Sequence, residues 1–422
     1  MPFIWELPSG TTPIFSLFGI AIADAGVVSL MREMEQVVEK PSVPKPAKAG
    51  RLGLIAKIVL SLVWLLALLE IVPRLFLATN LVMHQRVRRA LLGDDNSSWR
   101  LFWVVLHRQH EEWTGKYATY HPLRGWAVMP NVTNMTPFGK GKVVNSNANG
   151  LRGTTQYQYA RTPGKQRILV LGDSFTFGTD VSDNETYSHY LEAALPNTEV
   201  LNLGVQGYGQ DQMLLYLQEE GVKYDPDIVI LGFAFMDTYR NLWKFFAFAK
   251  PKFEMGRQSL QLTNVPVPTP EQVLAEEPYH SKAVDLAVIL REKIRWSLGM
   301  NEKDARELTR PILDQIVSTT RGIGAVPVFV YLPAYEEVDD LSSSMSDHEQ
   351  YLNNYCRERD VSCLFLRPRF RREAARGAKL ESRFHWTAEM HQMAAQEIEG
   401  FLVAKGLVQP ETAGEPAVAS SR

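Results

Sequence analysis

A single serine stands where an apolar segment of the chain ends in glycine. Residues 167–171 read Arg-Ile-Leu-Val-Leu, and Gly172, Asp173 and Ser174 follow them. Such a run predicts a buried β-strand, and the carboxyl ends of strands are where α/β sheets carry out chemistry. The residues after Ser174 have helical character, so free backbone N–H groups would lie beside its hydroxyl. The pattern predicts a nucleophile with part of an oxyanion hole.

A serine hydroxyl is a poor nucleophile at neutral pH, so it needs a base within hydrogen-bond reach. The chain has 9 histidines. His385 follows the last predicted strand and precedes a predicted terminal helix, where a loop can bring its ring over the carboxyl edge of a sheet. The alternative for His385 is a capping or packing role. His391 falls within that helix and is expected to face solvent or core.

Strand-like and helix-like segments alternate over much of the chain, which predicts a parallel sheet wrapped by helices, an α/β fold. Strands are expected near residues 168–171, 200–203, 228–232, 326–332 and 362–366. Helices are expected near 187–195, 210–220, 308–322 and 388–404. The proline-rich segment 251–278 is expected to run over the surface, and the Asn- and Gly-rich loop 145–153 to border the active site.

An apolar segment near the N-terminus, residues 52–74, predicts one transmembrane helix. Lys57 can snorkel and Glu70 can pair with Arg74, so the spanning length reaches roughly 20 residues. A buried core helix is the alternative. Basic residues both precede and follow the segment, so the positive-inside rule barely discriminates between the two orientations.

Composition excludes several classes of function. The 422 residues include 45 basic and 47 acidic side chains, a net charge of −2 that gives no argument for nucleic-acid binding. Cys356 and Cys363 are too few for a disulfide scaffold or a zinc site; they are expected to be buried or free thiols, or a bridge if the domain lies outside the cytoplasm. No metal-ligand cluster and no phosphate-binding glycine motif is visible, so no metal and no cofactor is predicted.

Three motifs, in order along residues 120–405, resemble the SGNH (GDSL-like) hydrolases, especially their membrane-anchored bacterial members. Gly172-Asp173-Ser174 is similar to the first block, which carries the nucleophile. Gly204 is similar to the glycine of the second block, and His385-Trp386-Thr387 to the last block, which supplies the base. The resemblance implies a three-layer, flavodoxin-like SGNH hydrolase domain, with the backbone N–H groups of Ser174 and Gly204 in the oxyanion hole. Asp173 is expected to support the site by hydrogen bonding to backbone.

The chain departs from the family pattern in two places. The third block usually presents Asn-Asp, whereas this sequence has Met236-Asp237, and a methionine cannot donate to an oxyanion. Asn241 is the candidate substitute if the loop folds back, with Asp237 as a supporting residue. The aspartate expected shortly before the histidine is also missing. The nearest carboxylate is Glu381, the candidate third member of a weakened triad; a Ser-His dyad is the alternative.

Together these features predict five segments: a flexible tail (1–51), a transmembrane helix (52–78), an irregular lead-in (79–160), an SGNH hydrolase-like domain (161–407) and a disordered tail (408–422). The predicted function is that of a single-pass, membrane-anchored serine esterase or O-acyltransferase whose domain lies outside the cytoplasm, in the periplasm. Family analogy suggests an ester substrate such as an O-acetylated cell-envelope glycan. The alternative is a degenerate domain that binds glycan or a partner protein without turnover.

Overall fold

The computed structural model describes residues 51–77, 95–109, 117–257, 259–334, 337–338, 344–378, 380 and 385–409. Two compact units divide the chain, one comprising residues 2–72 and the other residues 73–422. The predicted tails lie outside the described residues, apart from Arg51 and residues 408–409.

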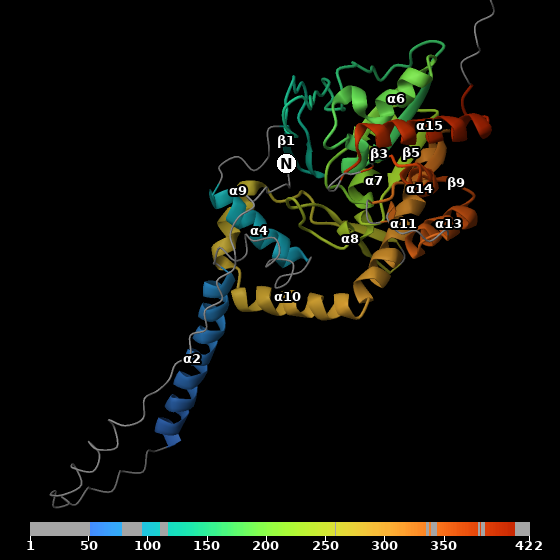
Figure 1. Cartoon of the computed structure of the whole chain (residues 1–422). Helices are drawn as coiled ribbons and strands as arrows, with labels where there is room; N and C mark the ends of the chain where they lie inside the picture. Colours follow the sequence, from blue (N-terminus) through green and yellow to red (C-terminus); the bar gives the residue numbers. More distant parts are fainter. Residues whose placement is uncertain are drawn as a thin grey trace, which may run out of the picture. The chain divides into compact units, whose positions relative to one another are not determined.

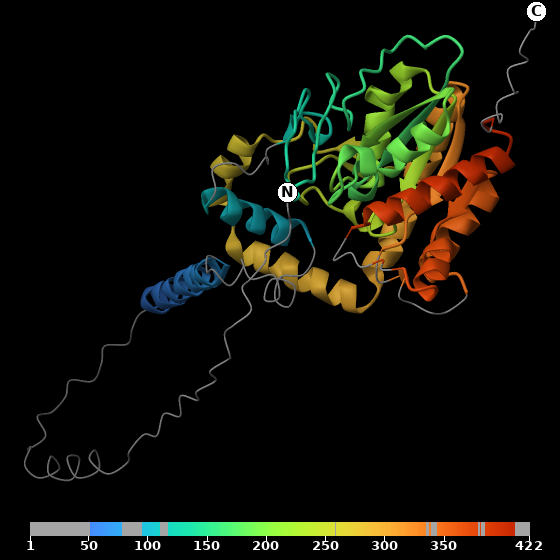
Figure 2. The ribbon, with the colours of Figure 1, turned by 45° about the horizontal axis from the view of Figure 1, so that its top comes forward.

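A parallel sheet of five strands forms the centre of the larger unit (Figures 1 and 2). The strands are β3 (Gln166–Gly172), β4 (Thr198–Gly204), β5 (Ile228–Phe233), β8 (Val326–Tyr331) and β9 (Ser362–Phe365). Their spatial order is β4-β3-β5-β8-β9, and every neighbouring pair is parallel. The first strand of the sheet therefore lies between the second and the third, which is the doubly wound order of flavodoxin-like proteins. The α/β fold class and the five predicted strands are confirmed.

Helices cover both faces of this sheet. One face carries α7 (Gln210–Glu219), α11 (Met300–Gly322) and α13 (Asp347–Arg359), and the other carries α6 (Tyr187–Ala194), α14 (Arg367–Ala375) and α15 (Ala388–Ala404). The helices predicted at 187–195, 210–220 and 388–404 are confirmed as α6, α7 and α15. The helix predicted from 308 begins earlier, at Met300, because Ala305 and Asn301 continue its buried face by one and two turns.

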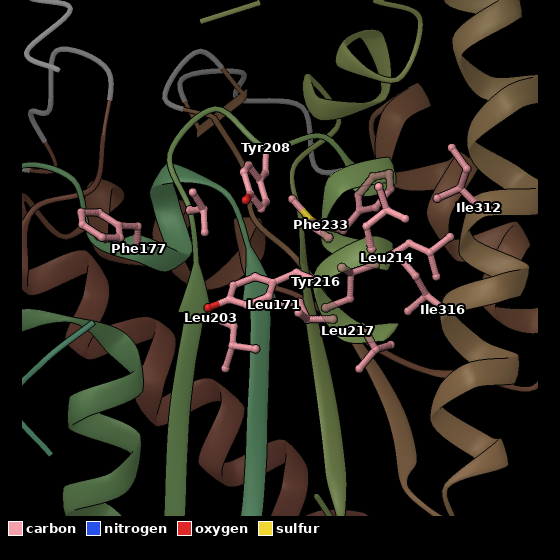
Figure 3. Close-up of a cluster of buried hydrophobic side chains, with 14 of the residues drawn as sticks. Leu171, Phe177, Leu203, Tyr208, Leu214, Tyr216, Leu217, Phe233, Ile312 and Ile316 are labelled. Carbon is pink, nitrogen blue, oxygen red and sulfur yellow. The ribbon is translucent and has the colours of Figure 1, made fainter. Parts of the chain in front are cut away.

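Two hydrophobic cores follow from the alternation of side chains along each strand. Leu169 and Leu171 of β3 belong to the core beneath α7 and α11, whereas Ile168 and Val170 belong to the core beneath α6 and α15. Figure 3 shows the first core, in which sheet residues such as Leu171 face the leucines of α7 and the isoleucines of α11. Both faces of β3 and β5 are buried along residues 168–171 and 228–231, so these stretches are continuously apolar.

Two segments are more ordered than the sequence predicts. The lead-in contains α4 (Asn96–Gln109) and the hairpin of β1 (Ala118–His121) and β2 (Gly125–Val128). The segment expected to run over the surface contains the hairpin of β6 (Lys252–Met255) and β7 (Leu260–Thr263), then α9 (Pro270–Glu276) and a short turn, η4 (Glu277–Tyr279). Phe253 and Val267 are buried. Pro270 is the first residue of α9, where its missing N–H costs no helical hydrogen bond.

The N-terminal apolar segment forms one long helix, α2 (Arg51–Leu77). Its stretch Gly53–Leu75 is 23 residues long with a mean hydropathy of 2.4, and most of its side chains are exposed. Among the described residues, it is the one helix long and apolar enough to cross a membrane.

His391 of α15 is completely buried, and its Nδ1 accepts a hydrogen bond of 3.2 Å from the N–H of Tyr187 at the start of α6. Burial lowers the pKa of His391 from 6.5 to about 3. The neutral ring therefore links two helices that cover the same face of the sheet.

This histidine should make the protein less stable in acid. Between pH 6.5 and pH 3 the unfolded chain binds a proton at this residue while the folded chain does not. The free energy of unfolding should therefore fall with falling pH, by up to about 1.4 kcal/mol per pH unit from this residue. Urea unfolding of the full chain at pH 7 and pH 5 measures this, with His391→Asn as the control because it keeps an acceptor for Tyr187. The difference in stability between the two proteins should shrink at pH 5; parallel pH dependences would contradict the assignment.

Candidate active site

The nucleophile region is a tight turn between β3 and the short helix α5 (Ser174–Phe177). Asp173 caps this helix, because its Oδ1 accepts a 2.9 Å hydrogen bond from the N–H of Phe175. A Cβ atom at Gly172 would lie 1.9 Å from Oγ1 of Thr176, so the turn has no room for a side chain there. Ser174 follows directly at the carboxyl end of β3, beside the point where the strand order reverses.

His385 meets Ser174 at this edge. Nε2 of His385 lies 3.0 Å from Oγ of Ser174, although the two residues are 211 positions apart in the chain. The neighbouring Trp386 is buried, and its indole N–H donates to the carbonyl of Pro333 at 3.1 Å. Thr387 then caps α15. The histidine is thus fixed by the residues that follow it.

The other ring nitrogen faces Asp180. Oδ2 of Asp180 lies 3.3 Å from Nδ1 of His385, which completes a Ser-His-Asp arrangement. Asp180 follows α5 in the same loop as the nucleophile and has a φ of 69°, in the left-handed region that aspartate tolerates better than most residues. The sequence prediction of Glu381 as the acid falls on a residue outside the described ones. The carboxylate that contacts the ring is Asp180, which the sequence analysis did not select.

Two sets of contacts hold the Asp180 loop in place. Arg152 is buried, forms a 2.5 Å ion pair with Asp183 and donates to the carbonyl of Val181 at 2.9 Å. On the other side, Gln206 in the loop after β4 donates to Oγ1 of Thr179. The predicted border loop 145–153 therefore contacts the segment just after the acid.

The predicted oxyanion donors are placed differently from one another. Ser174 N–H is the first amide of α5, and the described hydrogen bonds give it no acceptor. Gly204 N–H donates to Oδ1 of Asn202 at 2.9 Å, so it is already engaged within its own strand end. The N–H of Ser174 is therefore available as a donor at the nucleophile, whereas the N–H of Gly204 is already hydrogen-bonded.

Asn241 does not substitute for the missing asparagine. It is fully buried, and its amide donates to Oε1 of Gln210 at 2.9 Å and to Oγ1 of Thr309 at 2.8 Å. The loop does not fold back, because Asn241 continues directly from the short helix α8 (Asp237–Arg240) and faces α7 and α11. Met236 occupies the family position before α8 and is 38% exposed at the same edge as Ser174.

A buried cluster of charges lies behind the nucleophile. Arg240 approaches Oδ2 of Asp173 at 3.4 Å, donates to the carbonyl of Tyr208 at 2.8 Å and forms an ion pair with Asp237. Burial, together with the charge of Asp173, raises the pKa of Asp237 well above its usual value despite Arg240. Arg240 thus offsets the Asp173 carboxylate, whereas burial and the charge of Asp173 favour a neutral Asp237, and this arrangement fits the supporting role predicted for both aspartates.

The geometry suits acyl transfer through serine. A hydroxyl, an imidazole and a carboxylate are connected in sequence, and a backbone N–H lies at the nucleophile. Within the described ranges, no group of three or more His, Cys, Asp or Glu side chains could hold a metal ion.

Comparison with solved structures finds matches at low sequence identity and low TM-score. A protein of the G-D-S-L family from Desulfitobacterium hafniense DCB-2 is 12% identical, with 56% of this chain and 100% of that chain covered and a TM-score of 0.34. An acetylxylan esterase from Geobacillus stearothermophilus is 13% identical, with 58% and 96% covered and a TM-score of 0.35. A two-domain esterase active on acetylated mannans is 12% identical, with 60% and 53% covered and a TM-score of 0.36.

No curated protein matches the chain by sequence. The model of the GDSL-like Lipase/Acylhydrolase family, in contrast, matches residues 170–393. This match extends over more than half of the chain and contains both Ser174 and His385. The chain therefore belongs to the GDSL-like lipase/acylhydrolase family, the SGNH serine hydrolases that act on esters.

Proposed function

We propose that this protein is a membrane-anchored serine esterase that forms an acyl-enzyme on Ser174 and works at the surface of the cell membrane. The observation that carries the proposal is the connected chain of Asp180, His385 and Ser174, with distances of 3.3 Å and 3.0 Å between the partners. A degenerate domain would not need an imidazole placed between a hydroxyl and a carboxylate.

The reaction follows from these contacts. His385 Nε2 takes the proton of Ser174 as Oγ attacks the ester carbonyl, and Asp180 stabilises the imidazolium. The tetrahedral intermediate collapses when its C–O bond to the alcohol breaks, and the imidazolium gives its proton to the departing oxygen. Water, or a sugar hydroxyl in the transferase alternative, then attacks the acyl-serine with His385 again as the base. Ser174 leaves with the returned proton.

The site is incomplete on the oxyanion side, which limits the expected rate. Met236 supplies no donor and Gly204 N–H is engaged, so the proposal relies on Ser174 N–H. Each missing donor costs about 3 kcal/mol of transition-state stabilisation. We therefore expect a slower enzyme than a family member with all donors. Met236 is also the observation that favours the alternative function, binding of glycan or protein without turnover.

The proposed substrate is an acylated polymer of the cell envelope, with an O-acetylated glycan as the first choice. Ser174 is 8% exposed, and the ring of Phe175 lies 5.6 Å, centre to centre, from the ring of His385, which favours a small acyl group such as acetyl. Tethering through α2 would keep the site beside polymers at the membrane surface.

The proposed compartment is the periplasm. Cys356 near the end of α13 and Cys363 in β9 form a disulfide, with their Cα atoms 6.3 Å apart. Disulfides persist in oxidising compartments outside the cytoplasm. This disulfide supports a domain on the outer side of the membrane. The basic residues on the two sides of α2 do not discriminate between the two orientations.

The first test of the proposed function concerns the nucleophile and the base. Ser174→Ala and His385→Ala should each lower kcat for p-nitrophenyl acetate by about 10⁴-fold or more, because the groups act as one unit. Gln396→Ala on the exposed side of α15 is the matched control and should be neutral. Equal rates in all four proteins would leave binding without turnover as the function.

The second prediction separates the two candidate acids. Asp180→Asn should lower kcat by about 10⁴-fold, the loss found when a serine triad loses its orienting carboxylate. Glu381→Gln should leave kcat near the wild-type value. The reverse result, a loss with Glu381→Gln alone, would restore the acid predicted from the sequence.

The third prediction concerns topology. Alkaline phosphatase fused after residue 409 of the full chain should be active in a bacterial host, because that enzyme folds only where disulfides form. A fusion after residue 50 should be inactive, since α2 places the two ends of the chain on opposite sides. Activity in the second fusion and not the first would reverse the proposed orientation.

A further inference from the structure

Helix α10 (Lys282–Ser297) turns its apolar side outward. Val284, Leu290 and Ile294 are 60%, 52% and 61% exposed, and Leu298 just beyond the helix is 67% exposed. Val284, Ile294 and Leu298 are separated by intervals that place them on one side of an α-helix. A stripe of large aliphatic side chains in water is unusual for a surface helix and marks a contact surface.

The inward side of α10 is the charged one. Lys282, Asp285 and Ile289 are its buried residues. Arg100 of α4 lies 2.6 Å from the carboxylate of Asp285, and Lys282 lies 3.1 Å from the same group. These buried ion pairs fix the rotation of the helix, so the outward direction of the apolar stripe follows from specific contacts.

The end of α2 meets the start of α10 within the larger unit. Arg74 donates to the carbonyls of Pro278 at 3.4 Å and His280 at 3.2 Å, just before α10. Leu77 is buried in a small cluster with Leu101 of α4 and Ile289 of α10. The candidate membrane span ends at Leu75, between these two contacts. If α2 spans a bilayer, the first turn of α10 lies at the boundary of that bilayer.

The residues around the stripe are of the types found at membrane surfaces. Tyr279, at the end of η4 and three residues before the start of α10, is 89% exposed, and tyrosine is enriched at the level of lipid headgroups. Arg291 is a highly exposed cation on the outward side, and its long stem allows the charge to reach the headgroups. An apolar face with basic residues beside it is the composition of helices that lie in the membrane interface.

We propose that α10 is a second membrane contact: its outward stripe, Val284, Leu290, Ile294 and Leu298, lies in the interfacial layer of the bilayer that α2 crosses. The inference rests on the proposed anchoring through α2. The bilayer is the occupant because the candidate span ends beside the start of α10, where Arg74 and Leu77 make their contacts, and the exposed stripe begins in the first turn of that helix, at Val284. The domain is then held at two points, which fixes its orientation toward the membrane as well as its distance.

The test uses the full chain reconstituted in phosphatidylcholine and phosphatidylglycerol vesicles. A single environment-sensitive fluorophore is attached to Ile294→Cys, to Gln396→Cys on the exposed side of α15, or to Ser61→Cys within α2. Cys356 and Cys363 are bonded to each other and do not compete for the label. Quenching is measured with lipids that carry a nitroxide near the headgroup, with lipids that carry one on the acyl chain, and with a water-soluble quencher.

The label at residue 294 should show blue-shifted emission, strong quenching by the lipid nitroxide and protection from the aqueous quencher, while the label at 396 should behave as one in water. Quenching at 61 by lipid together with a water-exposed label at 294 would overturn the contact through α10 while leaving the anchor intact. A label at 294 shielded from both quenchers would also overturn it and indicate a protein partner or second copy. Absence of lipid quenching at 61 would refute the anchor itself.

Discussion

The hydrogen bond between Ser174 and His385 is the constraint on which the rest of the domain depends. A nucleophile at the end of the first sheet strand must meet a base that arrives 211 positions later, and the separation of 3.0 Å leaves little tolerance. The fold meets this demand by packing α15 next to α6 on one face of the sheet (Figure 1). Phe175, Trp386 and Met390 belong to the same buried core, so the residues flanking both reactive groups are held by one packed cluster.

Charge is arranged around this contact in two different ways. On the solvent side, Asp180 faces the imidazole and balances the positive charge that develops there. Behind the nucleophile, Arg240 offsets Asp173, and the neutral form of Asp237 is favoured by burial. An uncompensated carboxylate at that place would oppose the negative charge of a tetrahedral intermediate. The buried arginine therefore makes an acid-rich turn compatible with acyl transfer.

Much of this arrangement was predictable from the sequence. Strand-like segments that alternate with helix-like ones located the five strands, and the order of the motifs located Ser174 and His385. The acid was not predictable by motif, because Asp180 reaches the ring through a left-handed backbone turn after α5, and sequence spacing does not encode that geometry. The hydrogen bonds of Asn241 and Gly204 were not predictable for a related reason: their partners, Gln210, Thr309 and Asn202, are brought close only in the folded chain. The outward direction of the apolar side of α10 could not be predicted, because the spacing of apolar residues does not say which side of a helix faces inward.

The position of Asp180 changes what the C-terminal part of the chain has to supply. In this protein the carboxylate that contacts the imidazole and the nucleophile belong to one short loop, so under the proposed mechanism the chain before α15 has to supply only His385. That segment is freed from the spacing rule that ties an aspartate to the histidine elsewhere in the family. Its length and composition can drift during evolution, or be exchanged by engineering, as long as Trp386 and Thr387 still dock the imidazole.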